Sequence, residues 1–176
     1  MAKIAFIGFR GSGKSTLGRW LASELGVPFV DTDDEVLASM DYSSVTEAWK
    51  AEGEQAWRDA ESHVIPALLK RDAIFALGGG APMIPLVAKA LSTCDIVFNL
   101  TADEDETAHR IALGDDRPAL TSDDAEVRLS RLPAYAMLGT CGVDTSGNID
   151  DCKLRILDFI ENGRPTAQGG YAPHQG

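Results

Sequence analysis

The residues best suited to chemistry form one short stretch, residues 8–16, with the sequence GFRGSGKST. It fits the pattern G-x-x-x-x-G-K-[ST], in which glycines let backbone N–H groups turn towards a polyphosphate. Lys14 would reach the β- and γ-phosphates, and the Ser15 hydroxyl would take Mg²⁺. We therefore expect this loop to bind ATP with Mg²⁺, through Gly11, Ser12, Gly13, Lys14, Ser15 and Thr16.

Apolar residues flank this loop with two different spacings. Residues 4–7 form a short apolar run, which is typical of a buried parallel strand. After the loop, Leu17, Trp20, Leu21 and Leu25 recur at helical spacing, and residues 26–28 (GVP) supply a stop signal. A strand, a glycine loop and a helix in this order would place the positive end of the helix behind a bound phosphate.

Similar apolar runs recur along the chain and predict the fold class. They lie at residues 29–30, 73–77, 96–100 and, more weakly, 142–144. Helical patterns such as 44–49 and 54–69 separate them, and residues 149–160 form a closing amphipathic helix. This alternation predicts a three-layer α/β/α domain over residues 1–162 with a five-stranded parallel sheet. Because active sites in such sheets form beyond the carboxyl ends of the strands, we expect functional residues directly after each strand.

Acidic residues follow the second predicted strand, and glycines follow the third. Asp34 and Glu35 suit the first turn of a helix, whereas Asp31 and Asp33 share one face of an extended chain and suit a Mg²⁺ shell or an acceptor hydroxyl. Three consecutive glycines, residues 78–80, predict a backbone that comes close to a ligand and offers N–H groups to an anion. A flexible turn is the alternative for these glycines.

Two segments late in the chain are predicted to be mobile. Residues 112–125 are predicted to form a mobile lid, because GDDRP at 114–118 breaks a helix and polar residues continue to Asp124. Residues 163–176 are rich in Gly, Pro and Gln with a single aromatic, and we expect this tail to be disordered.

Charge and cysteine content exclude several classes of partner. The 176 residues carry a net charge of −11, so no overall field attracts nucleic acid or an anionic membrane. The three cysteines have no metal-binding spacing and suggest reduced thiols of a cytoplasmic protein. We find no secretory leader and no apolar run long enough to span a membrane. The sequence thus predicts a cytoplasmic protein, which we expect to be a monomer.

Six stretches together resemble the shikimate kinase family, which comprises small P-loop kinases built like nucleoside monophosphate kinases. The phosphate loop alone is generic, but the ordered set is specific, and the resemblance spans residues 3 to about 161. The stretches are residues 8–19, 29–33, 53–61, 77–81, 117–120 and 131–135.

The resemblance implies transfer of the γ-phosphoryl group of ATP to the 3-hydroxyl of shikimate, a step of aromatic amino acid biosynthesis. It implies that Arg58 and Arg131 grip the shikimate carboxylate and that Asp33 meets the ring hydroxyls. Taken alone, Arg58 among acidic neighbours would be a surface ion pair, but a bidentate guanidinium suits a carboxylate. The implied acceptor segment covers residues 32–62, and the implied shikimate site comprises Asp33, Arg58, Gly79, Gly80 and Arg131.

The resemblance also implies roles around the nucleotide. Lys14, Asp33 and Arg117 would be catalytic, with Arg117 contributed by the lid. Arg110 would lie near the adenine, and Ser15 and Asp31 would hold Mg²⁺.

The chain departs from the family pattern in places, and other functions stay open. It is a few residues shorter between Arg117 and Arg131, and it has Trp57 and Ala119 where the family usually has phenylalanine and leucine. An arginine pair also serves a phosphate, so a related kinase acting on gluconate or a nucleoside monophosphate is one alternative. A non-catalytic ATP-binding relative is another. A GTP-dependent switch is disfavoured, since no [NT]-K-x-D motif occurs.

Overall fold

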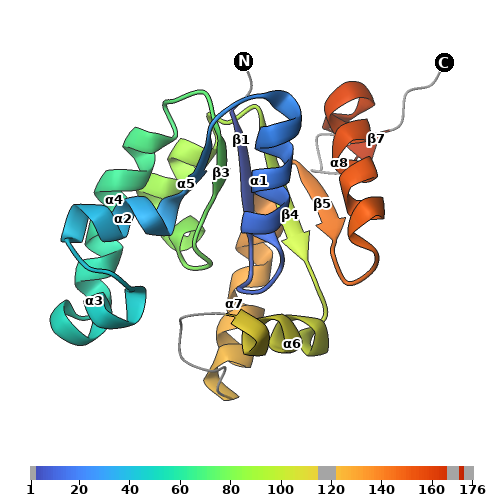
Figure 1. Cartoon of the computed structure of the whole chain (residues 1–176). Coiled ribbons are helices and arrows are strands. Elements are labelled where there is room, and N and C mark those ends of the chain that lie inside the picture. The colour runs from blue at the N-terminus through green and yellow to red at the C-terminus, as the bar shows by residue number, and fades with distance from the viewer. Residues whose placement is uncertain (1–2, 115–121, 166–170, 173–176) are drawn as a thin grey trace.

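The structure, a computed structural model, describes residues 3–114, 122–165 and 171–172 (Figure 1). Its centre is a five-stranded parallel sheet with the order β2-β3-β1-β4-β5. The strands are β1 (Ile4–Gly8), β2 (Phe29–Asp31), β3 (Ile74–Ala76), β4 (Ile96–Thr101) and β5 (Cys141–Asp144). The predicted α/β/α fold with five parallel strands is confirmed.

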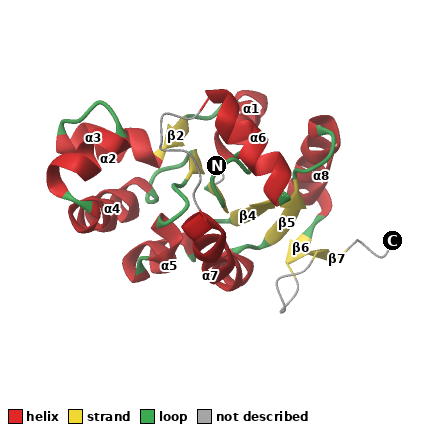
Figure 2. Cartoon of the chain, turned by 90° about the horizontal axis from the view of Figure 1, so that it is seen from below, coloured by secondary structure: helices red, strands yellow, loops and turns green. Residues whose placement is uncertain are grey.

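Alternating side chains of β1 divide the core into two halves. Ile4 and Phe6 pack on one side with α1 (Lys14–Leu25) and α8 (Ile149–Asn162). Ala5 and Ile7 pack on the other side with α4 (Glu54–Leu68), α5 (Pro85–Leu91) and α7 (Ser122–Leu138). Figure 2 shows the sheet between these helices. Both faces of the sheet are therefore covered, as the apolar strands require.

Three helices project at the β2 end of the sheet, and they contain the predicted acceptor segment, residues 32–62 (Figure 1). They are α2 (Thr32–Met40), α3 (Val45–Glu52) and α4. The Ser44 hydroxyl caps α3 by accepting from the Glu47 N–H at 3.1 Å. Gly53, with a φ of 88°, separates α3 from α4. These local signals explain why the boundaries of α3 and α4 lie close to those predicted from the sequence.

The segment predicted as a lid lies between two helices. Helix α6 (Glu104–Gly114) ends just before it and α7 begins at Ser122, so both margins of the predicted range 112–125 are helical. Residues 115–121, which include Arg117, lie outside the described residues. The lid therefore stays a prediction.

The C-terminal segment contains one short strand pair. Arg164–Pro165 (β6) pairs antiparallel with Tyr171–Ala172 (β7), whereas the composition predicted disorder from residue 163 onwards. The pairing uses backbone groups, so side-chain composition did not indicate it. Residues 166–170 and 173–176 are outside the described part.

All three cysteines are free thiols, and Cys141 and Cys152 are buried. Burial raises the pKa of the Cys94 thiol to about 11, so this thiol is protonated at neutral pH. None of the helices in the described ranges is long and apolar enough to cross a membrane.

Candidate active site

The phosphate loop joins β1 to α1 through three glycines with positive φ angles. These angles are 145° at Gly8, 79° at Gly11 and 97° at Gly13, values that residues with a Cβ rarely adopt. A Cβ on Gly8 would also lie 2.4 Å from the Leu100 carbonyl oxygen of β4. The glycines thus let the loop fold tightly against the sheet and open towards a cavity.

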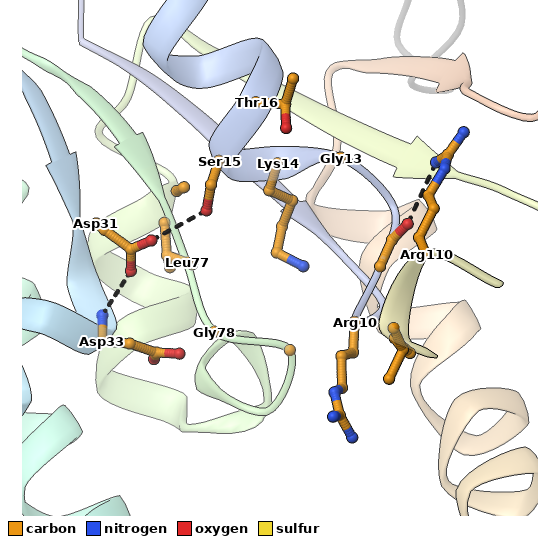
Figure 3. Close-up of a pocket in the computed structure, with 14 residues that line it drawn as sticks. Arg10, Gly13, Lys14, Ser15, Thr16, Asp31, Asp33, Leu77, Gly78 and Arg110 are labelled. Atoms are coloured by element: carbon orange, nitrogen blue, oxygen red, sulfur yellow. Dashed lines mark hydrogen bonds between the residues drawn. The ribbon is translucent and has the colours of Figure 1, made fainter. Parts of the chain in front are cut away.

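That cavity has a volume of about 410 Å³ and lies beyond the carboxyl ends of the strands (Figure 3). It brings together predicted residues from four separate parts of the chain. Ser12 is the exception among the predicted loop residues: it is 1% exposed and is absent from the lining, and its N–H donates to the Phe9 carbonyl at 3.1 Å. The lining residues predicted from the sequence are Gly11, Gly13, Lys14, Ser15, Thr16, Asp31, Asp33, Gly79 and Arg110.

Lys14 begins α1 and points its ammonium group into the cavity (Figure 3). Its Nζ donates to the carbonyl oxygens of Gly8 at 2.9 Å and Phe9 at 3.0 Å. The lysine is therefore held against its own loop at the positive end of a helix. A positive charge in this place suits the phosphates of a nucleotide.

Ser15 and Asp31 meet beside Lys14. The Ser15 hydroxyl donates to Oδ2 of Asp31 at 3.0 Å, and Oδ1 of Asp31 accepts from the Asp33 N–H at 3.0 Å as the cap of α2. Burial raises the pKa of the neighbouring Asp34, and the charge of Asp31 raises it further. The carboxylates thus create a negative field beside the cavity.

The Ser15–Asp31 pair fits the preferences of Mg²⁺. This ion takes oxygen ligands and typically uses one or two carboxylates together with water and substrate phosphates. No group of three or more His, Cys, Asp or Glu side chains that could hold a metal occurs in the described ranges. A hydroxyl and one carboxylate beside a phosphate loop are therefore suited to a metal that arrives with a nucleotide.

Each of the three consecutive glycines lies against a different charged side chain. A Cβ on Gly78 would lie 2.5 Å from Oδ1 of Asp33, and a Cβ on Gly80 would lie 2.4 Å from Nη2 of Arg58. A Cβ on Gly79 would lie 3.2 Å from Nη1 of Arg131. The glycine run thus gathers one carboxylate and two guanidinium groups on a single turn, which explains why side chains are absent there.

Arg58 lies in α4 and borders a second cavity of about 360 Å³, which Gly80 and Arg131 also line. Its Nη1 is 2.8 Å from Glu61, its Nη2 is 3.3 Å from Glu54, and its guanidinium lies 5.7 Å from the centre of the Trp49 ring. The ion pairs expected from the acidic neighbours are present. The same guanidinium also faces Gly80 of the glycine turn. Its predicted contact with the shikimate carboxylate stays a prediction.

The predicted acceptor residues are divided between the two cavities. Asp33 and Gly79 line the first, whereas Arg58, Gly80 and Arg131 line the second. Gly79 and Gly80 are consecutive, so the glycine turn borders both cavities.

Sequence reasoning missed the burial of one supporting residue and the role of another. Glu61, one of the acidic neighbours expected to pair with Arg58, is 1% exposed and lies 2.8 Å from Nη1 of Arg58. The Tyr135 hydroxyl is buried and donates to the Gly79 carbonyl, so it fixes the middle of the glycine turn. Glu61 lies three residues after Arg58 on a helix, a spacing that indicates a pair, but its burial has no local signal.

Arg110 is held tightly at the opposite side of the cavity. Its Nε donates to Glu106 at 2.9 Å, and its Nη1 donates to the Gly11 carbonyl at 3.2 Å. It therefore braces the phosphate loop while it lines the cavity. Its predicted contact with the adenine stays a prediction.

Comparison with known proteins agrees with this geometry. The model of the shikimate kinase family matches residues 10–160. Shikimate kinase of Mycobacterium ulcerans is 35% identical over 161 residues, which cover 88% of this chain and 86% of that protein. Shikimate kinase of Thermodesulfovibrio yellowstonii is 32% identical over 174 residues, with 93% and 99% covered.

A solved structure supports the same assignment. Shikimate kinase from Acinetobacter baumannii in complex with shikimate has a TM-score of 0.82 and 27% identity, and the match covers 92% of this chain and 93% of that one. The sequence relatives, the family model and this solved structure all point to one family. The chain belongs to the shikimate kinase family.

Proposed function

We propose that this protein transfers the γ-phosphoryl group of ATP to the 3-hydroxyl of shikimate, which gives shikimate 3-phosphate and ADP for aromatic amino acid biosynthesis. Membership of the shikimate kinase family supports the reaction. The observation that carries the acceptor assignment is the glycine turn, where Asp33, Arg131 and Arg58 each lie where a Cβ of one glycine would meet them. Two guanidinium groups and a carboxylate match a small acid that carries hydroxyl groups.

In this proposal the two cavities hold the two substrates. The phosphate loop and Lys14 bind the polyphosphate, and Arg110 borders the nucleotide. Arg58 and Arg131 bind the shikimate carboxylate across Gly79 and Gly80. Such binding places an acceptor hydroxyl between Asp33 and the phosphate loop, since both line the first cavity.

Catalysis then depends on positioning and on charge. Phosphoryl transfer needs little covalent chemistry from a protein, and alignment and electrostatic stabilisation supply most of the rate. Lys14 neutralises charge on the transferring group, while Asp33 orients the acceptor hydroxyl and is placed to accept its proton. Arg117 would add a further positive charge from the predicted lid and help to exclude water.

We also propose that Ser15 and Asp31 hold Mg²⁺. When bound, this ion supplies positive charge to the phosphate oxygens of ATP. Asp31 has a second duty as the cap of α2, so the metal site and the start of the acceptor segment share one side chain. We further propose a cytoplasmic monomer without nucleic-acid or membrane partners, in keeping with its net charge of −11.

The experiment is a coupled assay of ADP release with shikimate, gluconate, AMP, CMP and no acceptor. We expect rapid release with shikimate and slow hydrolysis otherwise. Lys14→Ala should abolish turnover with every acceptor, and Lys89→Ala, at an exposed position on α5, should behave as the wild type. A preference for gluconate or a nucleotide, or ATP binding without turnover, would overturn the proposal.

A further inference from the structure

We infer that Thr145, which belongs to no phosphate-binding motif of the sequence, is a positioning residue for the polyphosphate of the nucleotide. Its hydroxyl holds the peptide between Ser12 and Gly13 so that the Gly13 N–H turns towards the cavity. Thr145 directly follows β5 and is 5% exposed. Its Oγ1 donates to the Ser12 carbonyl at 2.7 Å across 133 residues of sequence. The inference deepens the proposed use of ATP and rests on it.

The direction of the Gly13 N–H follows from the geometry of the peptide. In a trans peptide the C=O and the N–H point in opposite directions, and the described residues contain no cis peptide. A carbonyl held from the β5 side therefore sends the Gly13 N–H to the other side, towards the cavity that Gly13 lines. Gly13 has a φ of 97°, and glycine adopts many backbone conformations because it lacks a Cβ. A hydrogen bond from outside the loop therefore helps to hold this peptide in one orientation.

Thr145 can act as an anchor because it is itself fixed. Its own N–H donates to the Thr101 carbonyl of β4 at 2.6 Å. Arg110 donates to the Thr145 carbonyl through Nη2 at 2.6 Å and to the Thr145 hydroxyl through Nη1 at 3.2 Å. With the hydroxyl accepting from Arg110, its hydrogen goes to Ser12 at 2.7 Å rather than to the more distant Thr101 carbonyl at 3.2 Å.

Two loop carbonyls are thus held from one cluster. Thr145 holds that of Ser12, and Arg110 holds that of Gly11 at 3.2 Å. The hydrogen bonds run in sequence from Arg110 through Thr145 to the loop, and such chains polarise and strengthen one another. The loop N–H groups are therefore oriented before a phosphate binds, which lowers the entropic cost of binding.

The test compares three variants by calorimetric titration with ADP and Mg²⁺ in the absence of shikimate. Thr145→Val keeps the shape of the side chain and removes the hydroxyl, whereas Thr145→Ser keeps the hydroxyl. Thr140→Val is the matched control. Thr140 directly precedes β5, as Thr145 directly follows it, and its hydroxyl donates to the Val97 carbonyl at 3.0 Å. Inorganic tripolyphosphate is titrated as a second ligand.

We expect Thr145→Val to raise the Kd for ADP and for tripolyphosphate about tenfold, the effect of one lost hydrogen bond at an oriented group. Thr145→Ser should restore both affinities, and the KM for shikimate should not change in any variant. Thr140→Val should lower the Tm but leave both Kd values unchanged. The inference would be overturned if Thr145→Val weakened the binding of ADP but not that of tripolyphosphate. It would also be overturned if Thr140→Val weakened the binding of both ligands as much as Thr145→Val does. A wild type that binds ADP without phosphorylating shikimate would contradict only the proposed function.

Discussion

Nη1 of Arg58 lies 2.8 Å from Oε2 of Glu61, a carboxylate whose side chain is only 1% exposed. Burial raises the pKa of Glu61, and the charge of Arg58 offsets part of this rise. Burial acts to lower the pKa of Arg58, but Glu61 and Glu54 outweigh it, so this pKa lies above its ordinary value. The guanidinium is therefore charged and held in one place before an acceptor binds.

Arg58→Ala should mainly weaken binding of the acceptor. Loss of a buried, charged contact costs about 2–5 kcal/mol, so the KM for shikimate should rise by at least about 30-fold. The Tm should also fall, because Glu61 would stay buried without its partner. Steady-state kinetics and thermal unfolding measure the two effects.

Glu54→Gln is the control for Arg58→Ala. Glu54 also contacts Arg58, at 3.3 Å, but its side chain is 59% exposed, and such ion pairs contribute little. Its KM for shikimate should stay within about twofold of the wild type. An unchanged KM in Arg58→Ala would show that the acceptor site lies elsewhere.

Gly80→Ala should displace Arg58. The new Cβ would lie 2.4 Å from Nη2 of Arg58, so the guanidinium must shift and its ion pair with Glu61 weakens. We expect the KM for shikimate to rise about tenfold or more and the Tm to fall, but no further than in Arg58→Ala.

Gly142→Ala is the matched control for Gly80→Ala, since a Cβ there meets no atom within 4 Å. It should leave both the KM and the Tm near their wild-type values. An unchanged KM in Gly80→Ala would mean that the close approach of Gly80 to Arg58 has no part in acceptor binding.

Glu61→Gln should change how stability depends on pH. The raised pKa means that the folded protein binds this proton more tightly than the unfolded chain does. The stability that this group contributes is therefore complete below its unfolded pKa and is lost as the pH rises through its folded pKa. A glutamine cannot titrate, so the Tm of Glu61→Gln relative to wild type should increase from about pH 4 to about pH 8.

Thermal unfolding across this pH range, with Arg58→Ala as the second variant, measures the effect. Removal of Arg58 takes away the charge that lowers the pKa of Glu61, so Arg58→Ala should lose more stability with rising pH than the wild type does. Parallel Tm curves for wild type and Glu61→Gln would contradict the raised pKa.

The sequence predicted those parts of the molecule that depend on local pattern. The strands follow from apolar periodicity, the phosphate loop follows from its glycine–lysine motif, and Asp31 follows from the rule that sites form at strand ends. Asp33 was expected on an extended segment with Asp31, but it lies in the first turn of α2, which Asp31 caps. Gly53 and Ser44 mark helix ends through local chemistry, and the structure has both boundaries there.

The missed residues depend on which distant elements meet. Thr145 contacts Ser12 across 133 residues, and Tyr135 contacts Gly79 across 56 residues. Both contacts depend on how the strands and α7 come together around the sheet, whose order is β2-β3-β1-β4-β5. The amino-acid sequence does not state this strand order, so it carries no signal for these two contacts. The strand pair in the tail was also missed, because backbone groups form it and side-chain composition does not indicate such pairing.

Asp31→Asn should separate the metal role of Asp31 from its structural role. Asparagine also caps helices well, so the contact with the Asp33 N–H should survive and the Tm should change little. The lost negative charge should raise the Mg²⁺ concentration for half-maximal activity about tenfold or more, since carboxylates are the main protein ligands of this ion. Magnesium titration of ADP release at saturating ATP and shikimate measures this shift. Val36→Ala is the control for damage to α2: it should lower the Tm through a cavity in the core without changing the Mg²⁺ dependence. An unchanged Mg²⁺ dependence in Asp31→Asn would exclude Asp31 as a ligand of the ion and leave it only as a helix cap.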